Sequence, residues 1–302
     1  MDVSLFFNLL FDLIFIALPM DWNQLLSAHR YHPGSTTSLF HSHDRSQFQR
    51  DYDRLIFSSP FRRLQNKTQV FPLPGNIFVH NRLTHSLEVA SVGRSLGNKV
   101  SQFLKQQQVE IENPEILEEI GTIVSTGCLA HDLGNPPFGH SGEEAISYFF
   151  SEGEGLYFKK LLSDEEWNDL SHFEGNANTF RLLTHSFNGR RPGGYTMTYT
   201  TLASIVKYPF ESTKANPKGF KYGFFQSEKD IFRQVAGELG IRQLGDRCNM
   251  YAIRWYTLSK PLTISVTRLW ISKTHINYAY FLMTKPSLFW KAFMTKMKTK
   301  KI

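Results

Sequence analysis

Apolar residues recur every three or four positions along most of this chain of 302 residues. The clearest run covers residues 115–130, and a second follows Asn81. In the first run the apolar positions are Ile116, Leu117, Ile120, Ile123, Val124, Cys128 and Leu129. Shorter runs of the same spacing lie at 50–57, 145–150, 172–183, 202–206 and 231–239. Such spacing puts apolar side chains on one face of a helix. Because strand-like alternation is scarce, the pattern predicts an all-α body.

A short interruption follows the first run. Gly134 and the Pro136–Pro137 pair are expected to end that helix, which places His131 and Asp132 on its last turn. The acidic composition of the segment 151–171 predicts a loop with short helical turns.

The next helix has its own start signal. Ser141 and Glu144 have the spacing of a capping box, which predicts a helix from Ser141 onward. Glu143 is then left without a capping role and close to His140. A histidine next to a carboxylate is a candidate pair for moving a proton near neutral pH.

The adjacent His131 and Asp132 can give one nitrogen and one oxygen to a single metal ion. His85, in the first turns of the helix after Asn81, can add a second nitrogen. Mixed nitrogen and oxygen ligands suit Mg, Mn, Fe, Co, Ni or Zn. A purely structural explanation also exists, because a helix C-terminus favours His and a turn favours Asp.

Composition restricts the class of protein. Apolar residues make up 41% of the chain, which is enough for a core and excludes global disorder. The two cysteines, Cys128 and Cys248, are far apart, which argues for a reducing, cytoplasmic compartment and against a cysteine zinc site.

The charge is unevenly distributed. The net charge of +7 arises at the C-terminus, because residues 248–302 hold ten Lys and Arg and no acidic residue. Asp246 is the last carboxylate. A basic charge confined to a tail does not favour a nucleic-acid partner for the body.

The two ends differ from the middle, which predicts three segments: 1–19, 20–247 and 248–302. Residues 1–19 are apolar but lack a basic start and a cleavage site, and they are too short to span a bilayer. We interpret them as a dispensable extension, with a weak membrane anchor as the alternative. No membrane partner is expected for the rest.

Five motifs, in order over about residues 45–245, resemble those of HD-domain metal-dependent phosphohydrolases, and within them the deoxyguanosinetriphosphate triphosphohydrolases. The motifs are Phe61–Gln65 with Phe71–Leu73, Arg82–Ser86, His131–Glu143, Phe173–Ala177 and Lys207–Pro209. One departure is Asn178, where the family is expected to have Gln.

The resemblance implies an HD-domain helical bundle that hydrolyses a dNTP, dGTP favoured, to deoxynucleoside and triphosphate. It implies a divalent metal ion as cofactor and a homo-oligomer in full-length members. The implied metal ligands are His85, His131 and Asp132, and the implied catalytic residues are His140 and Glu143. The implied substrate contacts are Gln69 to the deoxyribose and Lys207 to phosphate, and Tyr208 is a further substrate-binding residue. Arg62 is a further candidate for phosphate, unless it belongs to a solvated basic helix face.

A fourth metal ligand of the family, an Asp from a later helix with the pattern E-A-A-D-D-I, is missing. Synonymous codons for residues 251–275 exist that spell this helix in a shifted reading frame. We therefore hypothesise a frameshift near residues 246–250, which would make 248–302 an out-of-frame tail, leave the bundle incomplete at its C-terminus and impair activity. A genuine basic tail is the alternative.

Two other functions stay open at this point. One keeps the HD fold but acts on another nucleotide or on a phosphate monoester. The other is a non-catalytic fragment that binds nucleic acid through its basic tail.

Overall fold

The computed structural model describes residues 21–32, 45–67, 81–188, 192–215, 220–241, 243–244 and 249–250. Residues Trp22–Thr263 form one compact unit, to which all of these except Asp21 belong. The extension 1–19, Gln69 and nearly all of the tail 248–302 lie outside the described residues, so the predictions about them stay predictions.

The described part of the chain is mostly helical, as predicted. Its α-helices are α2 (Trp22–Leu25), α3 (Gln47–Ile56), α4 (Ser59–Arg63), α5 (Arg82–Gln106), α6 (Ile120–Ala130), α7 (His140–Ser151), α8 (Asp164–Ser171), α9 (Gly175–Thr184), α10 (Tyr199–Ile205) and α11 (Lys229–Glu238). Its 3-10 helices are η1 (Leu64–Asn66), η2 (Pro114–Glu119), η3 (Glu154–Leu161), η4 (Ser212–Lys214) and η5 (Gln226–Glu228). The only described strands, β1 (Gln243–Leu244) and β2 (Asn249–Met250), pair antiparallel.

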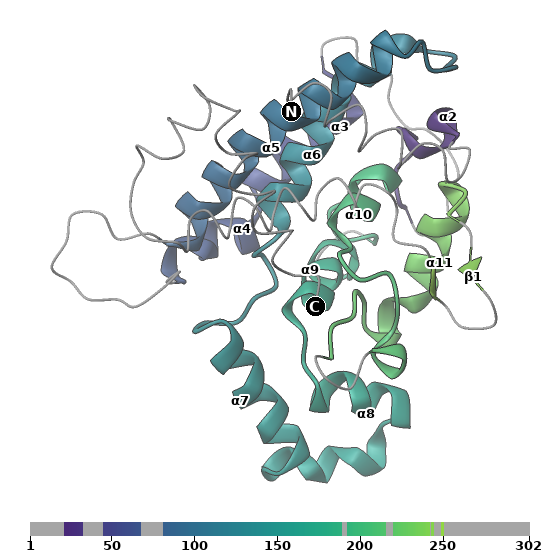
Figure 1. Cartoon of the computed structure of the whole chain (residues 1–302). Helices are drawn as coiled ribbons and strands as arrows, with labels where there is room; N and C mark the ends of the chain where they lie inside the picture. Colours follow the sequence, from purple (N-terminus) through teal and green to yellow (C-terminus); the bar gives the residue numbers. More distant parts are fainter. Residues whose placement is uncertain are drawn as a thin grey trace, which may run out of the picture. The chain divides into compact units, whose positions relative to one another are not determined.

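Helices α5 and α6 lie alongside each other (Figure 1). Their backbones approach closely because small residues meet at the contact: a Cβ added at Gly97 would lie 2.8 Å from the Gly121 Cα. Helix α6 also packs against α3 and α10. All but one of its residues are buried, so its C-terminal end is held in a fixed position.

A buried ion pair fastens α3 to the start of α10. Asp51 is fully buried and lies 2.6 Å from a guanidinium nitrogen of Arg30. Its second oxygen accepts hydrogen bonds from the Thr198 backbone N–H at 2.9 Å and hydroxyl at 2.7 Å. Thr198 is in turn the N-cap of α10. One carboxylate therefore sets the position of two helices that flank α6.

The segment between α7 and α9 is more regular than predicted. Residues 151–171 contain η3 and the two-turn helix α8, whose start has a complete capping box between Ser163 and Glu166. Along α7 and η3 several large apolar side chains are exposed: Tyr148, Phe149, Leu156, Tyr157, Phe158 and Leu161. None of the described helices combines the length and the apolar character needed to cross a membrane.

Asp169 of α8 fastens the segment before α11 to this helix. Its Oδ2 accepts a hydrogen bond from the Gln226 backbone N–H at 2.6 Å, and its carbonyl accepts one from the Tyr222 hydroxyl at 2.9 Å. Burial raises the pKa of Asp169 to about 6, although hydrogen bonds from Ser212 and Gln226 oppose the shift.

This raised pKa predicts a pH dependence of stability. The folded state holds the Asp169 proton more tightly than the unfolded state, in which the pKa is near 3.8. The contribution of Asp169 to the free energy of unfolding is therefore full below about pH 4. It falls by about 3 kcal/mol as the pH rises to about 6 and is constant above that.

Asp169→Asn is expected to remove this dependence, because the amide does not titrate. Urea denaturation between pH 4 and pH 7 measures it, with Asp164→Asn in the same helix as an exposed control. An unchanged pH profile in Asp169→Asn would show that Asp169 titrates normally.

Candidate active site

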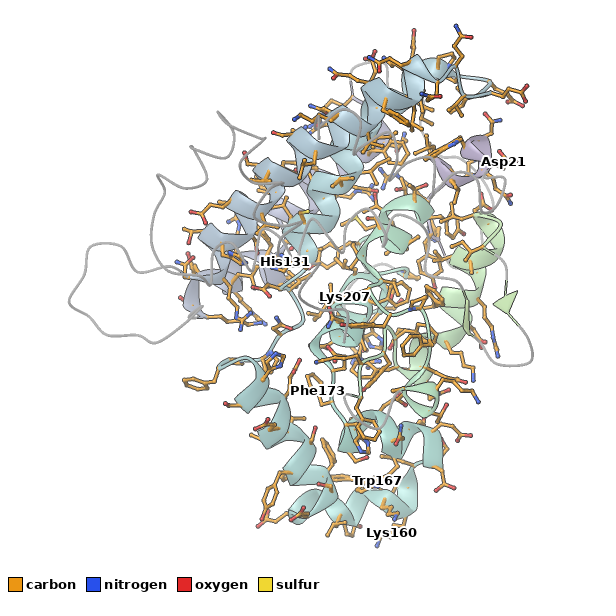
Figure 2. The ribbon with its side chains drawn as sticks, in the orientation of Figure 1. Asp21, His131, Lys160, Trp167, Phe173 and Lys207 are labelled. Carbon is orange, nitrogen blue, oxygen red and sulfur yellow. The ribbon has the colours of Figure 1, made fainter. Side chains whose placement is uncertain are left out.

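The three predicted metal ligands come together at the ends of two helices. His85 lies in the first turn of α5, His131 is the C-cap of α6, and Asp132 follows it. One ligand atom from each lies within 4.8 Å of the other two, and the two imidazole centroids are 5.2 Å apart. His85 and Asp132 are buried and His131 is half-buried. Figure 2 marks His131 at the end of α6.

The backbone orients the His131 ring. Its Nδ1 lies 2.7 Å from the Cys128 carbonyl oxygen. Because a carbonyl can only accept, Nδ1 carries the hydrogen, and Nε2 keeps the lone pair that a metal ion needs. Nε2 lies 3.5 Å from Asp132 Oδ1.

The two oxygens of Asp132 differ in their surroundings. Oδ1 accepts a hydrogen bond from the Asn135 amide at 2.7 Å and lies 3.0 Å from a guanidinium nitrogen of Arg82. Oδ2 is buried and accepts no hydrogen bond within the described structure. Burial opposes ionisation of Asp132, but His131 and Arg82 outweigh it and hold its pKa below the usual value. A buried anionic oxygen without a donor fits a bound cation, so the residues present suit a metal ion.

Two basic residues, neither of which was predicted to belong to the metal site, hold the surrounding loop. Lys67 Nζ donates to the backbone carbonyls of Leu133 at 3.3 Å and Asn135 at 2.6 Å. Burial, followed by the charge of Arg82, lowers the pKa of Lys67. Arg82 stands three residues before His85 in the Arg82–Ser86 motif. Its place in that motif was the one sign in the sequence that Arg82 could belong to the site.

Asn178, where the family is expected to have Gln, has a structural role. Its side-chain amide donates to the Gly134 carbonyl at 2.8 Å, while the Gly134 N–H donates to Thr179 Oγ1 at 2.9 Å. Helix α9 therefore fixes the turn that follows the metal cluster.

His140 and Glu143 form a pair at the start of α7, as predicted. His140 Nδ1 lies 2.7 Å from Glu143 Oε2, and Glu143 Oε1 accepts from the Gly175 N–H at 2.9 Å. Glu143 is buried, whereas the His140 side chain is 83% exposed. Glu143 can therefore orient a ring that solvent or substrate reaches.

The predicted capping box at Ser141 and Glu144 is wrong. Helix α7 begins one residue earlier, at His140. Its N-cap is Gly139, which has no side chain that could accept a capping hydrogen bond. Gly139 has a φ of 61°, and a Cβ there would lie 3.0 Å from an Arg82 guanidinium nitrogen. Arg82 therefore pairs with Asp132 and also lies close to Gly139, the residue before His140.

The predicted substrate residues are more dispersed. Arg62 is exposed, with its guanidinium 5.9 Å from the centre of the Phe57 ring. Lys207 and Tyr208 are half-buried and follow α10, which packs on α6; Figure 2 marks Lys207. Lys207 Nζ lies 5.4 Å from the centre of the Tyr208 ring. Their contacts with a substrate stay predictions, and Gln69 lies outside the described residues.

Comparison with known proteins bears on this arrangement. Residues 82–208 match the family model described as "HD domain", and the match includes the metal cluster and the His140–Glu143 pair. The chain contains an HD domain. The resemblance to HD-domain proteins predicted from the motifs is confirmed, and so is the helical fold.

The similarity to curated relatives extends beyond the HD domain. The chain is 46% identical over 233 residues to a deoxyguanosinetriphosphate triphosphohydrolase-like protein of Pseudomonas aeruginosa, and this alignment covers 75% of the chain and 51% of the relative. It is 46% identical over 236 residues to one from Synechocystis, covering 74% and 52%. It is 33% identical over 227 residues to a deoxyguanosinetriphosphate triphosphohydrolase of Yersinia enterocolitica, covering 64% and 44%. The chain spans about half the length of these relatives.

Proposed function

We propose that the HD domain of this chain is a metal-dependent phosphohydrolase that acts on dNTPs, dGTP preferred, and releases deoxynucleoside and triphosphate. One observation carries the proposal. Two imidazoles and a carboxylate form a buried cluster, and a histidine–glutamate pair begins the next helix, α7. The names of the relatives supply the class of substrate.

His85, His131 and Asp132 would hold a divalent ion through two nitrogens and one oxygen, which first-row ions such as Mn²⁺ and also Mg²⁺ accept. When bound, such an ion polarises phosphoryl oxygens and lowers the pKa of a coordinated water. Arg82 fixes Asp132, and the Cys128 carbonyl fixes the ring of His131.

The His140–Glu143 pair supplies proton transfer. Because Nδ1 of His140 donates to Glu143, Nε2 is the atom that exchanges a proton with the substrate or with water. We assign Lys207 and Arg62 to the phosphates, where positive charge stabilises a polyanionic leaving group, and Tyr208 to the bound substrate.

We further expect turnover by this chain to be low. Only three metal ligands lie in the described residues, and no acidic residue follows Asp246 to supply a fourth. An ion with three protein ligands is held less tightly, so less of the chain carries it at a given metal concentration.

The test is product analysis. Purified chain is incubated with dGTP and Mn²⁺, and triphosphate, pyrophosphate, phosphate and deoxyguanosine are separated by chromatography, with His140→Gln as control. Triphosphate and deoxyguanosine in equal amounts, at well below about 1 s⁻¹, are expected. Phosphate or pyrophosphate as the product would point to another HD reaction, and turnover of about 10 s⁻¹ would contradict the expected impairment.

A further inference from the structure

A lysine connects the His140–Glu143 pair to a second buried carboxylate. Lys221 Nζ lies 2.6 Å from Glu174 Oε2 and 3.7 Å from Glu143 Oε2. Glu174 is 1% exposed and Glu143 8% exposed, and they come from the N-cap of α9 and the first turn of α7. Two buried carboxylates on different helices therefore share one ammonium group.

The remaining contacts of both carboxylates are already fixed. Glu174 Oε1 accepts from the Asn176 backbone N–H at 3.2 Å and so caps α9. Glu143 Oε1 accepts from the Gly175 N–H, and Oε2 faces His140. Lys221 therefore supplies one ammonium group to both carboxylates.

The position of Lys221 is set by its neighbours in sequence. Tyr222 is fully buried and donates its hydroxyl to the Asp169 carbonyl. The Gly223 N–H donates to the Phe210 carbonyl at 3.1 Å, and a Cβ at Gly223 would lie only 2.0 Å from the Tyr208 carbonyl oxygen. The segment is thus tied to α8 and to the stretch that holds the predicted phosphate residues.

The charge of Lys221 matters because both carboxylates are buried from water. Burial opposes the charged form of Lys221, but Glu174 and then Glu143 outweigh it and raise the pKa of the ammonium above its usual value. Two carboxylates without this ammonium would repel each other in a buried site, and one of them would take up a proton.

We propose that Lys221 is a positioning residue that keeps Glu143 ionised, so that Glu143 accepts a hydrogen bond from His140 Nδ1 and leaves Nε2 of that ring free for proton transfer. This deepens the proposed function, since it names what holds the proton-transferring histidine. A protonated Glu143 can instead donate to Nδ1, which places the ring hydrogen on Nε2, the form that free neutral imidazole prefers.

The tautomer of His140 is the test, because it can be measured without turnover. The full chain is labelled with ¹⁵N-histidine, the His140 ring signals are assigned by their loss in His140→Gln, and spectra are recorded where the ring is neutral. In the unaltered chain the Nδ1–H form is expected to dominate. In Lys221→Met it is expected to become the minor form, as in Glu143→Gln.

A double variant separates charge compensation from a general structural effect. In Lys221→Met/Glu174→Gln only one carboxylate remains, so Glu143 is expected to ionise again and the Nδ1–H form to return. Lys229→Met is the matched control, because Lys229 pairs with a different carboxylate, that of Glu211, at 2.5 Å. If Lys221→Met does not fold, as judged by thermal unfolding, Lys221→Gln takes its place.

The outcomes decide between the two proposals. Retention of the Nδ1–H form in folded Lys221→Met or Lys221→Gln overturns the role of Lys221, and so does failure of the double variant to restore it. Where triphosphate release is measurable, kcat is expected to fall at least tenfold in Lys221→Met with KM within about twofold, and to recover partly in Lys221→Arg. Absence of triphosphate release alone would count against the proposed function and leave the tautomer result standing.

Discussion

Asp132→Asn is expected to lower the affinity of the chain for Mn²⁺ by more than about 100-fold, because even residues that only support a ligand contribute 10- to 100-fold. The substitution keeps the size of the side chain but removes the charge from Oδ2, the buried oxygen that accepts no hydrogen bond within the described structure. It also leaves Arg82 without its ion pair, so a cation in the pocket meets an uncompensated guanidinium.

Calorimetric titration of metal-free protein with Mn²⁺ measures this effect. Asp230→Asn is the matched control, because Asp230 is 91% exposed and pairs with Arg233 at the surface. Circular dichroism establishes that Asp132→Asn is folded. Equal Mn²⁺ binding by Asp132→Asn and the unaltered chain would exclude Asp132 as a ligand.

Asp51→Ala is expected to lower the free energy of unfolding by about 3–5 kcal/mol, because it leaves a largely buried guanidinium without its partner. The side chain of Arg30 is 15% exposed, and the Thr198 N–H and hydroxyl lose their acceptor at the same time. Helix α10 would lose its attachment to α3, and with it the support of the segment that carries Lys207.

Urea denaturation at pH 7 measures the loss, with Asp53→Ala in the same helix as control. Asp53 pairs with Arg45, which is 62% exposed, so its removal is expected to change the free energy of unfolding by less than about 1 kcal/mol. Similar losses in the two variants would mean that the buried pair adds nothing beyond a surface pair.

The sequence was most informative where hydrophobic spacing decides the structure. The apolar run 115–130 and the run after Asn81 predicted the two ligand helices, and α5 and α6 fall there. Because His85, His131 and Asp132 lie at the ends of these helices, their meeting could also be expected. Their burial and the role of Arg82 could not, since both depend on how the loop after α6 folds back.

A single local signature gave both a correct and an incorrect answer. The pattern of Ser followed three residues later by Glu occurs at Ser141 and at Ser163. It caps α8 at Ser163, but at Ser141 the helix has already begun, because the turn at Gly139 starts it at His140. The local pattern cannot distinguish these cases, since the earlier start at His140 follows from the positive φ of Gly139, which lies outside the Ser–Glu pattern.

Lys221 shows the limit of reading from the sequence alone. It lies 78 positions after Glu143 and 47 after Glu174, with no helical or strand period to connect them. The packing of Tyr222 against α8 and α9 places Lys221 beside the two carboxylates. Glu174 was part of a recognised motif, yet its pairing with a lysine depends on the same tertiary contact.

Cys128 gives the molecule a built-in reporter of the state of the two ligand helices. It is buried where α5 meets α6, a Cβ at Gly93 would lie 2.6 Å from its sulfur, and burial raises its pKa to about 12. Alkylating reagents attack the thiolate and need access, so the rate of labelling at Cys128 follows the opening of this helix pair. The Cys128 carbonyl also holds the ring of His131. A metal ion bound by His85, His131 and Asp132 is therefore expected to slow the alkylation of Cys128.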